Sequence, residues 1–509
     1  MVERRSRGGA LTAGPIVADL GFPLGIRLTH AFNIVFLSLL VRSGIEILGG
    51  HPMLYFNDDC RPGSEWVRFT GKRMFRDRRW TAEDEKQTYS PWVALPGRDN
   101  LGLGRFWHFA SVIGWLLTGI AYLAILFTSD QWRRLVPTSW EVFQQAWDVG
   151  LTYLRLQIPA QGDPFNALQQ LTYFTLIFIL TPLQILTGLA MSPAMGGRFP
   201  WFPRIFGGRQ AARSLHFIGL VAYAGFTVHH TALVAAHGLL DGLSSIVLGA
   251  LAPTAAQQAV AAAITLAFVA GLVWLHVWAT RRSLLRPRAT QDMLQRLVDP
   301  VQARLLQPLG SRQRYGPRDI AVDPRPNGRP PGTEAYRELV ERSFEGWRFE
   351  IGGLVEDPLA LDLDELRTLG SERQTTMHKC VQGWSHVAEW EGVPLSALLE
   401  RCRPSPEARY ILFRTFDDKW EEPGHGEFYS VIDLGLARAP QTLLAFGMNG
   451  RALPVAFGAP LRLRLESQLG YNMAKWIRSM ELIERYDDIG EGCGGWRPDL
   501  LRYSRRAPI

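Results

Sequence analysis

The chain has 509 residues, of which 47% are hydrophobic, and a formal net charge of +7. This length allows two or three domains, each with a core of its own. The basic excess lies in arginine clusters beside long apolar runs, as at membrane flanks, and no aromatic–basic recognition motif occurs, so nucleic acid is excluded as the expected partner. The four cysteines, at positions 60, 380, 402 and 493, are too scattered for a disulfide framework or a zinc CxxC pair.

Five apolar segments in the first 280 residues are long enough to cross a bilayer, which takes roughly 20 helical residues. The segment before them, 8–19, is too weakly apolar for a cleavable signal, so the first span is expected to serve as the targeting signal. We predict an all-α transmembrane helical bundle over residues 1–280, multi-pass in the cell (inner) membrane and surrounded by lipid. The predicted spans are 25–48, 106–128, 169–191, 213–237 and 257–280.

Four histidines occupy matched positions in these spans. His30 and His108 lie near the starts of spans one and two, and His216 and His230 both lie in span four. Ionisable residues inside membrane helices are rare and usually functional. The two in span four are separated by roughly 21 Å of helix rise and point nearly the same way. Because consecutive spans are antiparallel, His108 can face His216 and His30 can face His230, which predicts two haems with two histidines each.

This layout resembles the di-haem b-type cytochrome subunits of nickel–iron hydrogenases, formate dehydrogenases and thiosulfate reductases, over about residues 20–240. In that family spans one and two supply one histidine each, span four supplies two and span three none. Segments 27–30, 51–55 and 104–109 fit the family as well. The resemblance implies two haem b groups and electron exchange with the quinone pool. The fifth span is expected to tether the C-terminal half of the chain, and structural roles are expected for His229, His237 and His276.

The second half of the chain is expected to be soluble. Arginines at 281–288 mark a membrane edge and a Pro/Gly-rich run covers 323–332, so residues 281–332 are predicted to be a linker. Residues 333–509 are predicted to form an α+β domain. Its expected elements are a strand entering a turn at 347–355, a helix capped by Asp362, and short strands at 410–415, 442–448 and 461–466.

The most informative motif of this half is TMHKCVQGWS at 376–385, followed by WEGVPL at 390–395. A thiolate is a soft ligand for a transition metal, and a lone cysteine indicates a metal held mainly by an organic cofactor. The motif resembles the molybdenum-ligating segment of the sulfite oxidase family, in which one cysteine completes the coordination of a molybdopterin-bound metal. The resemblance covers about 345–490 and includes LAFGMNG at 444–450, GAPLRL at 458–463 and GYNMAKW at 470–476.

The resemblance implies that Cys380 ligates molybdenum, whereas Cys402 and Cys493 are expected to be non-ligands. The pterin of this cofactor is polar and carries a phosphate, so it needs cationic side chains and a glycine turn whose backbone N–H groups can approach it. Similarity to the family's pterin-binding positions adds a threonine. The expected cofactor-binding residues are Thr415, Arg462, Gly470, Tyr471, Asn472 and Lys475.

The chain also departs from the family pattern. Phe457 stands where the family often has His or Asn, so one polar cofactor contact is expected to be missing. The arginine-rich anion pocket of sulfite oxidases has no counterpart beside Cys380, which places the chain closer to the bacterial branch that includes methionine-sulfoxide reductases. Other sources of positive charge are His378, Lys379, His386, Arg414 and Lys419.

These observations predict a membrane-bound molybdenum oxidoreductase. It would transfer an oxygen atom to or from a small oxyanion or sulfoxide and exchange electrons with quinone through both haems. A rival interpretation is a b-type cytochrome electron conduit whose C-terminal domain is a degenerate docking module. Phe457 favours the conduit, and the intact motif around Cys380 disfavours it. The direction of electron flow and assembly into a homo-oligomer stay open.

Two features give opposite orientations in the membrane. Arginines at 198, 204, 209, 213 and 281–288 favour a cytoplasmic C-terminal domain by the positive-inside rule. The absence of a twin-arginine export signal agrees with this orientation. Arg4, Arg5 and Arg7 favour instead a cytoplasmic N-terminus, which after five spans would place the catalytic domain outside. The balance favours the cytoplasm.

Overall fold

The computed structural model describes residues 21–72, 84–159, 165–418 and 426–509. Three parts of the sequence interpretation fall outside these ranges: the segment 8–19, the N-terminal arginines Arg4, Arg5 and Arg7, and Lys419. The remaining expectations all concern described residues.

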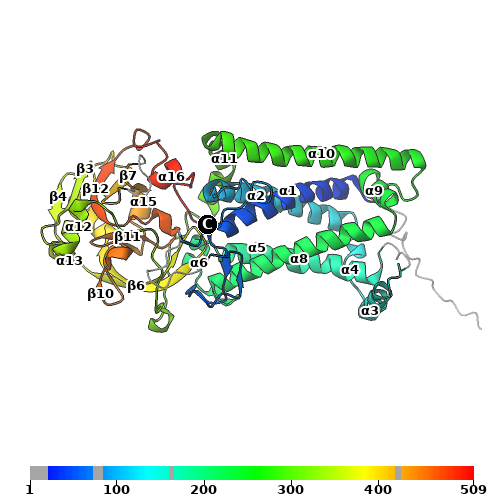
Figure 1. Cartoon of the computed structure of the whole chain (residues 1–509), viewed down its shortest axis with the longest axis horizontal. Helices are drawn as coiled ribbons and strands as arrows, with labels where there is room; N and C mark the ends of the chain where they lie inside the picture. Colours follow the sequence, from blue (N-terminus) through cyan, green and yellow to red (C-terminus); the bar gives the residue numbers. More distant parts are fainter. Residues whose placement is uncertain (1–20, 73–83, 160–164, 419–425) are drawn as a thin grey trace, which may run out of the picture. The chain divides into compact units, whose positions relative to one another are not determined.

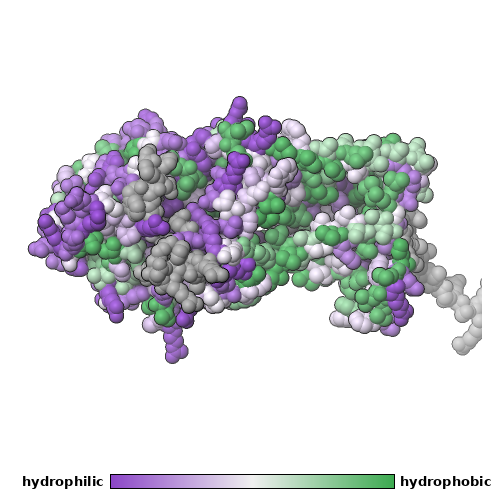
Figure 2. All heavy atoms as spheres, viewed as in Figure 1, coloured by the Kyte–Doolittle hydropathy of each residue, from purple (hydrophilic) through white to green (hydrophobic). Residues whose placement is uncertain are grey.

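Among the residues that the structure describes, five helices are long and apolar enough to cross a membrane, which confirms the five predicted spans. The second begins five residues earlier than predicted, at Leu101 rather than 106. Figure 2 shows hydrophobic residues gathered over the long helices. Ile120 and Leu266 are 65% and 71% exposed, which lipid accommodates and water does not. The spans are α1 (Leu24–Gly50), α2 (Leu101–Thr128), α4 to α5 (Ala167–Ala190), α8 (Arg209–Ala236) and α10 (Ala255–Leu285).

The third span contains a π-helical turn. It runs through α4 (Ala167–Phe174), η4 (Thr175–Leu180) and α5 (Thr181–Ala190). Pro182 has no N–H for the helix ladder, and the backbone N–H of Thr181 donates to the carbonyl of Leu176, five residues back. The π turn changes which residues of the span share a face, and α5 supplies two contacts to His216 described below.

Shorter helices connect or flank the spans. They are α3 (Glu141–Leu154), α6 (Pro193–Arg198), α7 (Trp201–Arg204), α9 (Leu239–Leu248) and α11 (Pro287–Leu305). Helix α11 lies within the range predicted to be a linker. It is amphipathic, with Thr290, Leu294 and Val298 buried at helical spacing, whereas 323–332 contains neither helix nor strand. The domain boundaries at 280 and 332 stay a prediction.

The C-terminal half is an α+β domain built on two five-stranded sheets (Figure 1), as predicted. The first sheet has the order β10-β9-β6-β5, and β11 also pairs with β9. Its strands are β5 (Glu372–Lys379), β6 (Ser385–Pro394), β9 (Thr442–Met448), β10 (Arg451–Ala452) and β11 (Arg462–Leu465). The second sheet has the order β4-β3-β12-β7-β8. Its strands are β3 (Phe349–Gly353), β4 (Leu359–Leu361), β7 (Tyr410–Thr415), β8 (Tyr429–Asp433) and β12 (Ile477–Ile483).

The predicted elements of this domain are confirmed. Asp362 caps α13 (Leu363–Thr368), and its carboxylate accepts hydrogen bonds from the backbone N–H groups of Asp364 and Glu365. Cys402 is the last residue of α14 (Leu395–Cys402). The domain also contains α12 (Glu334–Glu341), α15 (Leu434–Ala437) and α16 (Trp496–Leu500). Outside it, between α1 and α2, the strands β1 (Met53–Leu54) and β2 (Val67–Arg68) form a small antiparallel pair.

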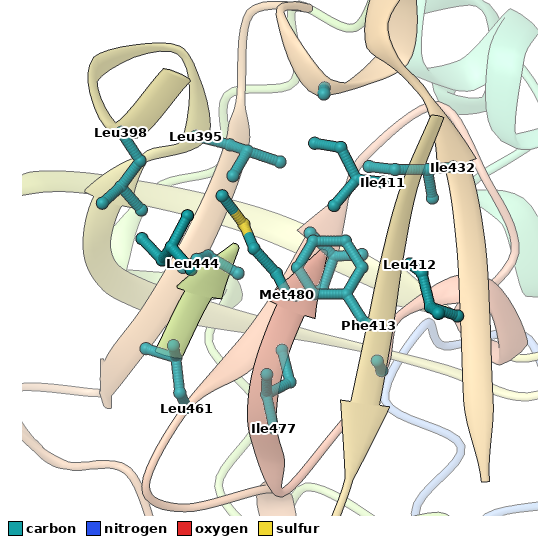
Figure 3. Packing of buried hydrophobic residues seen from close by; sticks show 14 of the residues in the cluster. Leu395, Leu398, Ile411, Leu412, Phe413, Ile432, Leu444, Leu461, Ile477 and Met480 are labelled. Atoms are coloured by element: carbon teal, nitrogen blue, oxygen red, sulfur yellow. The ribbon is translucent and has the colours of Figure 1, made fainter. Parts of the chain in front are cut away.

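One hydrophobic core joins the two sheets to α14. Figure 3 shows Phe413 of β7 and Met480 of β12 pointing toward Leu444 of β9 and toward Leu395 of α14. All four side chains are fully buried, and each contributes roughly 1.5–3 kcal/mol by leaving water. This packing fixes β11 and the start of β12, and the segments around them carry most of the predicted cofactor residues.

The chain divides into two compact units. The first comprises Met1–Leu37, Gly114–Leu183 and Val221–Leu275, and the second comprises Ser38–Ile113, Gln184–Leu220 and His276–Ile509. His30 and His230 fall in the first unit. His108 and His216 fall in the second, together with Cys380, so each predicted histidine pair belongs to one unit.

Candidate metal centres

Cys380 occupies the tip of the β5–β6 hairpin. Strands β5 and β6 are antiparallel with Lys379 opposite Ser385, and residues 380–384 form the turn. The Cys380 N–H donates to the Trp384 carbonyl at 3.0 Å, and the Gly383 N–H donates to the Cys380 carbonyl at 3.2 Å. Gly383 has φ +124°, a conformation that glycine adopts without strain. The thiol is 1% exposed, and none of the four cysteines forms a disulfide.

Basic and imidazole side chains surround this hairpin. His378 and His386 lie opposite each other on β5 and β6, with ring centroids 5.2 Å apart. Arg464 of β11 is paired with the buried carboxylate of Glu466 at 2.8 Å, and its Nη1 lies 3.0 Å from His378 Nδ1. Arg462 donates to the Phe457 carbonyl at 2.9 Å. The region around Cys380 is therefore buried and electropositive.

Several of these groups lack a partner within the described part of the chain. They are the Lys379 ammonium, both ring nitrogens of His386 and Nε of Arg462, all of them buried. Burial lowers the pKa of Lys379 to about 7, and burial together with the neighbouring arginines holds the pKa of His386 well below its ordinary value. A buried polar group left unpaired costs about 1–3 kcal/mol. Such groups suit a polar, anionic ligand.

The glycine turn predicted to contact the pterin lies against His378. Gly470 opens the short helix η7 (Gly470–Asn472), and a Cβ there would come within 2.2 Å of His378 Cε1. Tyr471 belongs to the same buried cluster as Cys380, and its hydroxyl donates to the Ser504 carbonyl at 2.5 Å. The Asn472 amide donates to the Arg505 carbonyl at 2.9 Å. The fold thus brings Gly470 and Tyr471 to the cysteine hairpin.

Arg462 and Lys475 both lie close to Gly458. A Cβ at Gly458 would be 3.0 Å from Lys475 Cβ and 3.2 Å from Arg462 Cβ. The Lys475 ammonium donates to the carbonyls of Asn327 and Ala456 and lies 3.8 Å from the centroid of the Trp476 ring. The side chains of the two cations predicted to hold the pterin therefore both pack against Gly458.

Thr415 is at the end of β7, in the second sheet. Its hydroxyl donates to the Phe428 carbonyl at 2.8 Å and accepts from the Asp417 N–H at 3.2 Å. Arg414 beside it is paired with Glu481 at 2.9 Å, so its charge is compensated. The contacts of Thr415 and Arg414 do not lead to the cysteine hairpin.

Phe457 is buried and packs edge-on against His386, with ring centroids 6.1 Å apart. Its carbonyl accepts the hydrogen bond from Arg462 described above. Phe457 therefore orients two groups of the electropositive region through its ring and its backbone. The missing polar contact at this position stays a prediction.

His108 on α2 and His216 on α8 are close enough to interact electrostatically. A hydroxyl lies beside each Nδ1: Ser43 Oγ is 3.1 Å from His108 Nδ1, and Thr187 Oγ1 is 3.1 Å from His216 Nδ1. Such a contact fixes the ring and leaves Nε2 as the nitrogen that can bind a metal. Gln184 of α5 also donates to the His216 carbonyl at 3.1 Å.

His30 on α1 and His230 on α8 form the second pair, and they too interact electrostatically. The Tyr173 hydroxyl lies 3.4 Å from His230 Nδ1, and Phe226 stacks on this ring with centroids 5.3 Å apart. Among the described residues, no group of three or more His, Cys, Asp or Glu side chains could hold a metal ion. A pair of histidines is compatible with haem iron, for which a porphyrin supplies the other ligands.

His276 differs from these four because both its ring nitrogens are engaged. Arg42 Nη1 lies 2.9 Å from Nδ1, and Ser38 Oγ lies 3.0 Å from Nε2. His237 places Nδ1 2.8 Å from the Leu233 carbonyl of its own helix. Histidines with structural roles make contacts of this kind.

Comparison with known families agrees with this arrangement. Residues 21–249 match the family described as Prokaryotic cytochrome b561, and residues 337–488 match the family described as Oxidoreductase molybdopterin binding domain. The chain joins a cytochrome b561 domain to a molybdopterin-binding oxidoreductase domain. The five apolar helices agree with an integral membrane protein, and the two matched families are of the kinds that bind haem b and molybdopterin.

Individual relatives match parts of the chain. The "Putative protein-methionine-sulfoxide reductase subunit YedZ1" of Azospira oryzae is 36% identical over 155 residues, 30% of this chain and 55% of the relative. The protein-methionine-sulfoxide reductase catalytic subunit MsrP of Xanthomonas axonopodis pv. citri is 36% identical over 160 residues, 30% of this chain and 50% of the relative. The chain spans about half the length of the curated relatives it matches.

One solved structure has a local likeness. The sulfane dehydrogenase SoxCD of Paracoccus pantotrophus is 25% identical, with a TM-score of 0.24, over 27% of this chain and 38% of that one. A TM-score this low carries no argument about function.

The residues present fit both cofactors. In the molybdopterin-binding domain, the unpartnered buried groups of Lys379, His386 and Arg462 match an anionic pterin phosphate, and Cys380 offers one soft ligand. In the cytochrome b561 domain, the hydroxyls beside His108 and His216 leave Nε2 for an axial bond. The individual ligand assignments stay predictions.

Sequence reasoning missed the partners that orient these groups. Ser43 and Thr187 are ordinary small residues of membrane helices, and a hydroxyl four residues from a helical carbonyl usually bonds that carbonyl. Cys60 lies in no recognisable motif, yet its Sγ accepts from the Ser385 N–H at 3.4 Å. Arg209 and Arg213 have the pattern of membrane-flank charges, so nothing in the sequence indicated the hydrogen bonds that they make to other segments.

Proposed function

We propose that this protein is a membrane-bound molybdenum sulfoxide reductase that draws electrons from quinol through two b haems. The observation that carries the proposal is the buried Cys380 hairpin enclosed by cationic and imidazole groups without partners. The relatives named above as methionine-sulfoxide reductase subunits support a sulfoxide as the oxygen donor. The chemistry is balanced, since quinol oxidation releases two electrons and two protons, and these convert a sulfoxide to a sulfide and water.

When bound, the molybdenum group supplies oxygen-atom transfer coupled to a two-electron redox change. Cys380 holds the metal from the hairpin tip. Arg462 and Lys475 neutralise the anionic part of the pterin, and Gly470 lets backbone N–H groups approach it. Tyr471 and Asn472 fix this turn through their bonds to the C-terminal segment.

Thr415 is assigned a supporting role. Its hydroxyl is engaged with the backbone of residues 417 and 428, so it holds the loop after β7. A contact of Thr415 with the pterin itself rests only on similarity to the family.

Each haem is proposed to be held by one histidine from α8 and one from another helix: His216 with His108, and His230 with His30. Ligands fourteen residues apart on one helix are separated by roughly 21 Å, which suits two haems stacked across a bilayer. For orientation we propose a cytoplasmic molybdenum domain, supported by the arginines at 198, 204, 209, 213 and 281–288. Protease treatment of intact spheroplasts tests this, since cleavage within 333–509 would place the domain outside.

The function is tested by haem absorbance in the detergent-purified protein. Quinol-reduced haems are expected to be reoxidised when a sulfoxide is added, and a Cys380→Ser variant is expected to keep the reduced spectrum. Oxidised haems that become reduced on addition of sulfite would reverse the direction of electron flow. Haems that respond to quinol but to none of these substrates would overturn the proposal in favour of the electron conduit.

A further inference from the structure

Side chains in the N-terminal turn of α8 donate hydrogen bonds to the turn that carries Cys380. Arg209 Nη1 donates to the Gly383 carbonyl at 2.7 Å, and Gln210 Nε2 donates to the same oxygen at 2.9 Å. The Gln210 amide also donates to Ser385 Oγ at 2.9 Å. One carbonyl of the cysteine turn therefore accepts hydrogen bonds from two adjacent side chains of a membrane helix.

Arg213, one turn further along α8, lies directly against the same glycine. A Cβ at Gly383 would be 3.1 Å from Arg213 Nε, closer than almost any real contact of this kind. Gly383 donates its N–H to the Cys380 carbonyl at 3.2 Å. Gly383 thus connects the Cys380 backbone to α8, in addition to the bond between Gln210 and Ser385.

Hydrogen bonds also hold the start of α8 to the loop after α1. Arg213 donates to the carbonyls of Met53 at 2.6 Å and His51 at 2.5 Å, and the Gln210 N–H donates to Asp58 Oδ1 at 2.9 Å. Ser385 Oγ donates to the Asp58 carbonyl at 2.9 Å. The loop after α1 therefore binds both the helix and the hairpin, and all of these groups belong to the second compact unit.

The same helix carries a predicted haem ligand immediately afterwards. His216 follows Arg213 by three residues, roughly 4.5 Å of helix rise. Its ring is fixed by Thr187 and its carbonyl by Gln184. A short run of hydrogen bonds and helix backbone thus leads from the Cys380 hairpin to His216.

We propose that Arg209, Gln210 and Arg213 are positioning residues that fix the Cys380 hairpin relative to His216 and so set the rate of electron passage between the two metal centres. The inference rests on the proposed function. Two electrons would pass for each sulfoxide reduced, through the haem that His216 is proposed to hold, and the two protons consumed with them are balanced by the two that quinol oxidation releases. If the three side chains served only to join domains, their loss would lower stability without a specific effect on this step.

The main test uses Gln210→Leu in the full chain, which keeps the side-chain size and removes the bonds to Gly383 and Ser385. Haem reduction by quinol is expected to match the wild type. Haem reoxidation by sulfoxide, expressed per bound molybdenum, is expected to fall roughly 10- to 100-fold, as for other partners that orient a metal ligand. Arg204→Ala is the matched control, since Arg204 donates to the Arg314 carbonyl and not to the cysteine hairpin.

A second readout needs no cofactor. In the chain produced without molybdopterin, hydrogen exchange of the 380–386 amides is expected to be faster in Gln210→Leu than in the wild type and in Arg204→Ala. Ser385→Ala removes the bond from Gln210 and the bond to the Asp58 carbonyl but keeps both bonds to the Gly383 carbonyl. It is expected to change both readouts in the same direction, and it replaces Gln210→Leu if that variant does not assemble.

The outcomes separate the two proposals. A wild type whose haems never respond to sulfoxide overturns the proposed function, and the exchange experiment then decides the positioning role by itself. A wild type that responds, with Gln210→Leu reoxidised at the wild-type rate, overturns the inference and leaves the proposed function standing. Unchanged exchange of the 380–386 amides also overturns it.

Discussion

The proposed molybdenum site at Cys380 and the proposed haem site at His108 and His216 are built differently. Around Cys380, one ligand is accompanied by a set of buried cations and imidazoles from β5, β6 and β11, several of them without partners in the described chain. At His108 and His216, the ligands come from helices, and a single hydroxyl beside each Nδ1 orients the ring. The difference indicates that the proposed molybdenum site would depend on complementary charge, whereas the proposed haem site would depend on the orientation of its ligands.

The strongest test of this comparison removes one ligand from each site. Cys380→Ser is expected to abolish molybdenum retention, because no other soft ligand is predicted there, and to leave the haem spectrum unchanged. Metal analysis and absorbance of the same sample measure both. Cys402→Ser, a buried helix residue in the same domain, is the control and should keep its molybdenum. Full molybdenum content in Cys380→Ser would remove Cys380 as the ligand.

His216→Leu is expected to have the opposite pattern. Loss of one axial ligand should lower the haem content from two groups to one and leave molybdenum unchanged, since the cationic groups around Cys380 are intact. Pyridine haemochrome analysis measures the haem content. His229→Leu, which removes the neighbour of His230 on the same helix, should keep both haems. An unchanged haem content in His216→Leu would contradict the pairing with His108.

Gly470→Ala tests how closely the electropositive region is packed. The added methyl group would meet His378 at 2.2 Å, so the ring must move, and overpacking of this kind costs about 1–3 kcal/mol. A lower unfolding temperature and weaker molybdenum retention are expected. Gly352→Ala is the control, because a Cβ there meets nothing within 4 Å. Equal stability of the two variants would show that the contact with His378 is unimportant.

Thr187→Val removes the hydroxyl beside His216 and nearly preserves the side-chain volume. Loss of such a partner lowers metal affinity by roughly 10- to 100-fold. Haem is therefore expected to remain at synthesis but to be released faster to an apo-globin acceptor. Thr231→Val, whose hydroxyl bonds only its own helix, is the control. Unaltered release from Thr187→Val would show that the His216 ring needs no hydroxyl to hold it.

The smallest expected effect is a pH dependence. His386 has its pKa held well below the ordinary 6.5 by burial and by Arg462, Arg464 and Arg325. The unfolded chain binds a proton there below pH 6.5 and the folded chain does not, so stability falls with falling pH by up to about 1.4 kcal/mol per pH unit. In the cofactor-free chain, His386→Gln should flatten the fall in unfolding temperature between pH 6.5 and 5. An equal fall in both proteins would mean that His386 is protonated when folded.

The sequence alone determined the features that depend on local pattern. The lengths of the apolar runs give five spans, the alternation and turns give β7, β9 and β11, and Asp362 caps α13 because its carboxylate bonds nearby backbone groups. The cysteine motif and the histidine spacing also led to both domain families. The amphipathic helix α11 was missed because its polar, proline-containing sequence is typical of a connector.

Tertiary structure decided which partners complete each site. Ser43 and Thr187 reach the histidines only because α1 packs near α2 and α5 packs near α8. Gln210 reaches Gly383 across 173 positions of the chain, and Cys60 reaches Ser385 across 325. Local periodicity reports which face of an element is apolar, but a hydrogen bond between distant segments depends on how the packed elements bring two atoms within about 3 Å.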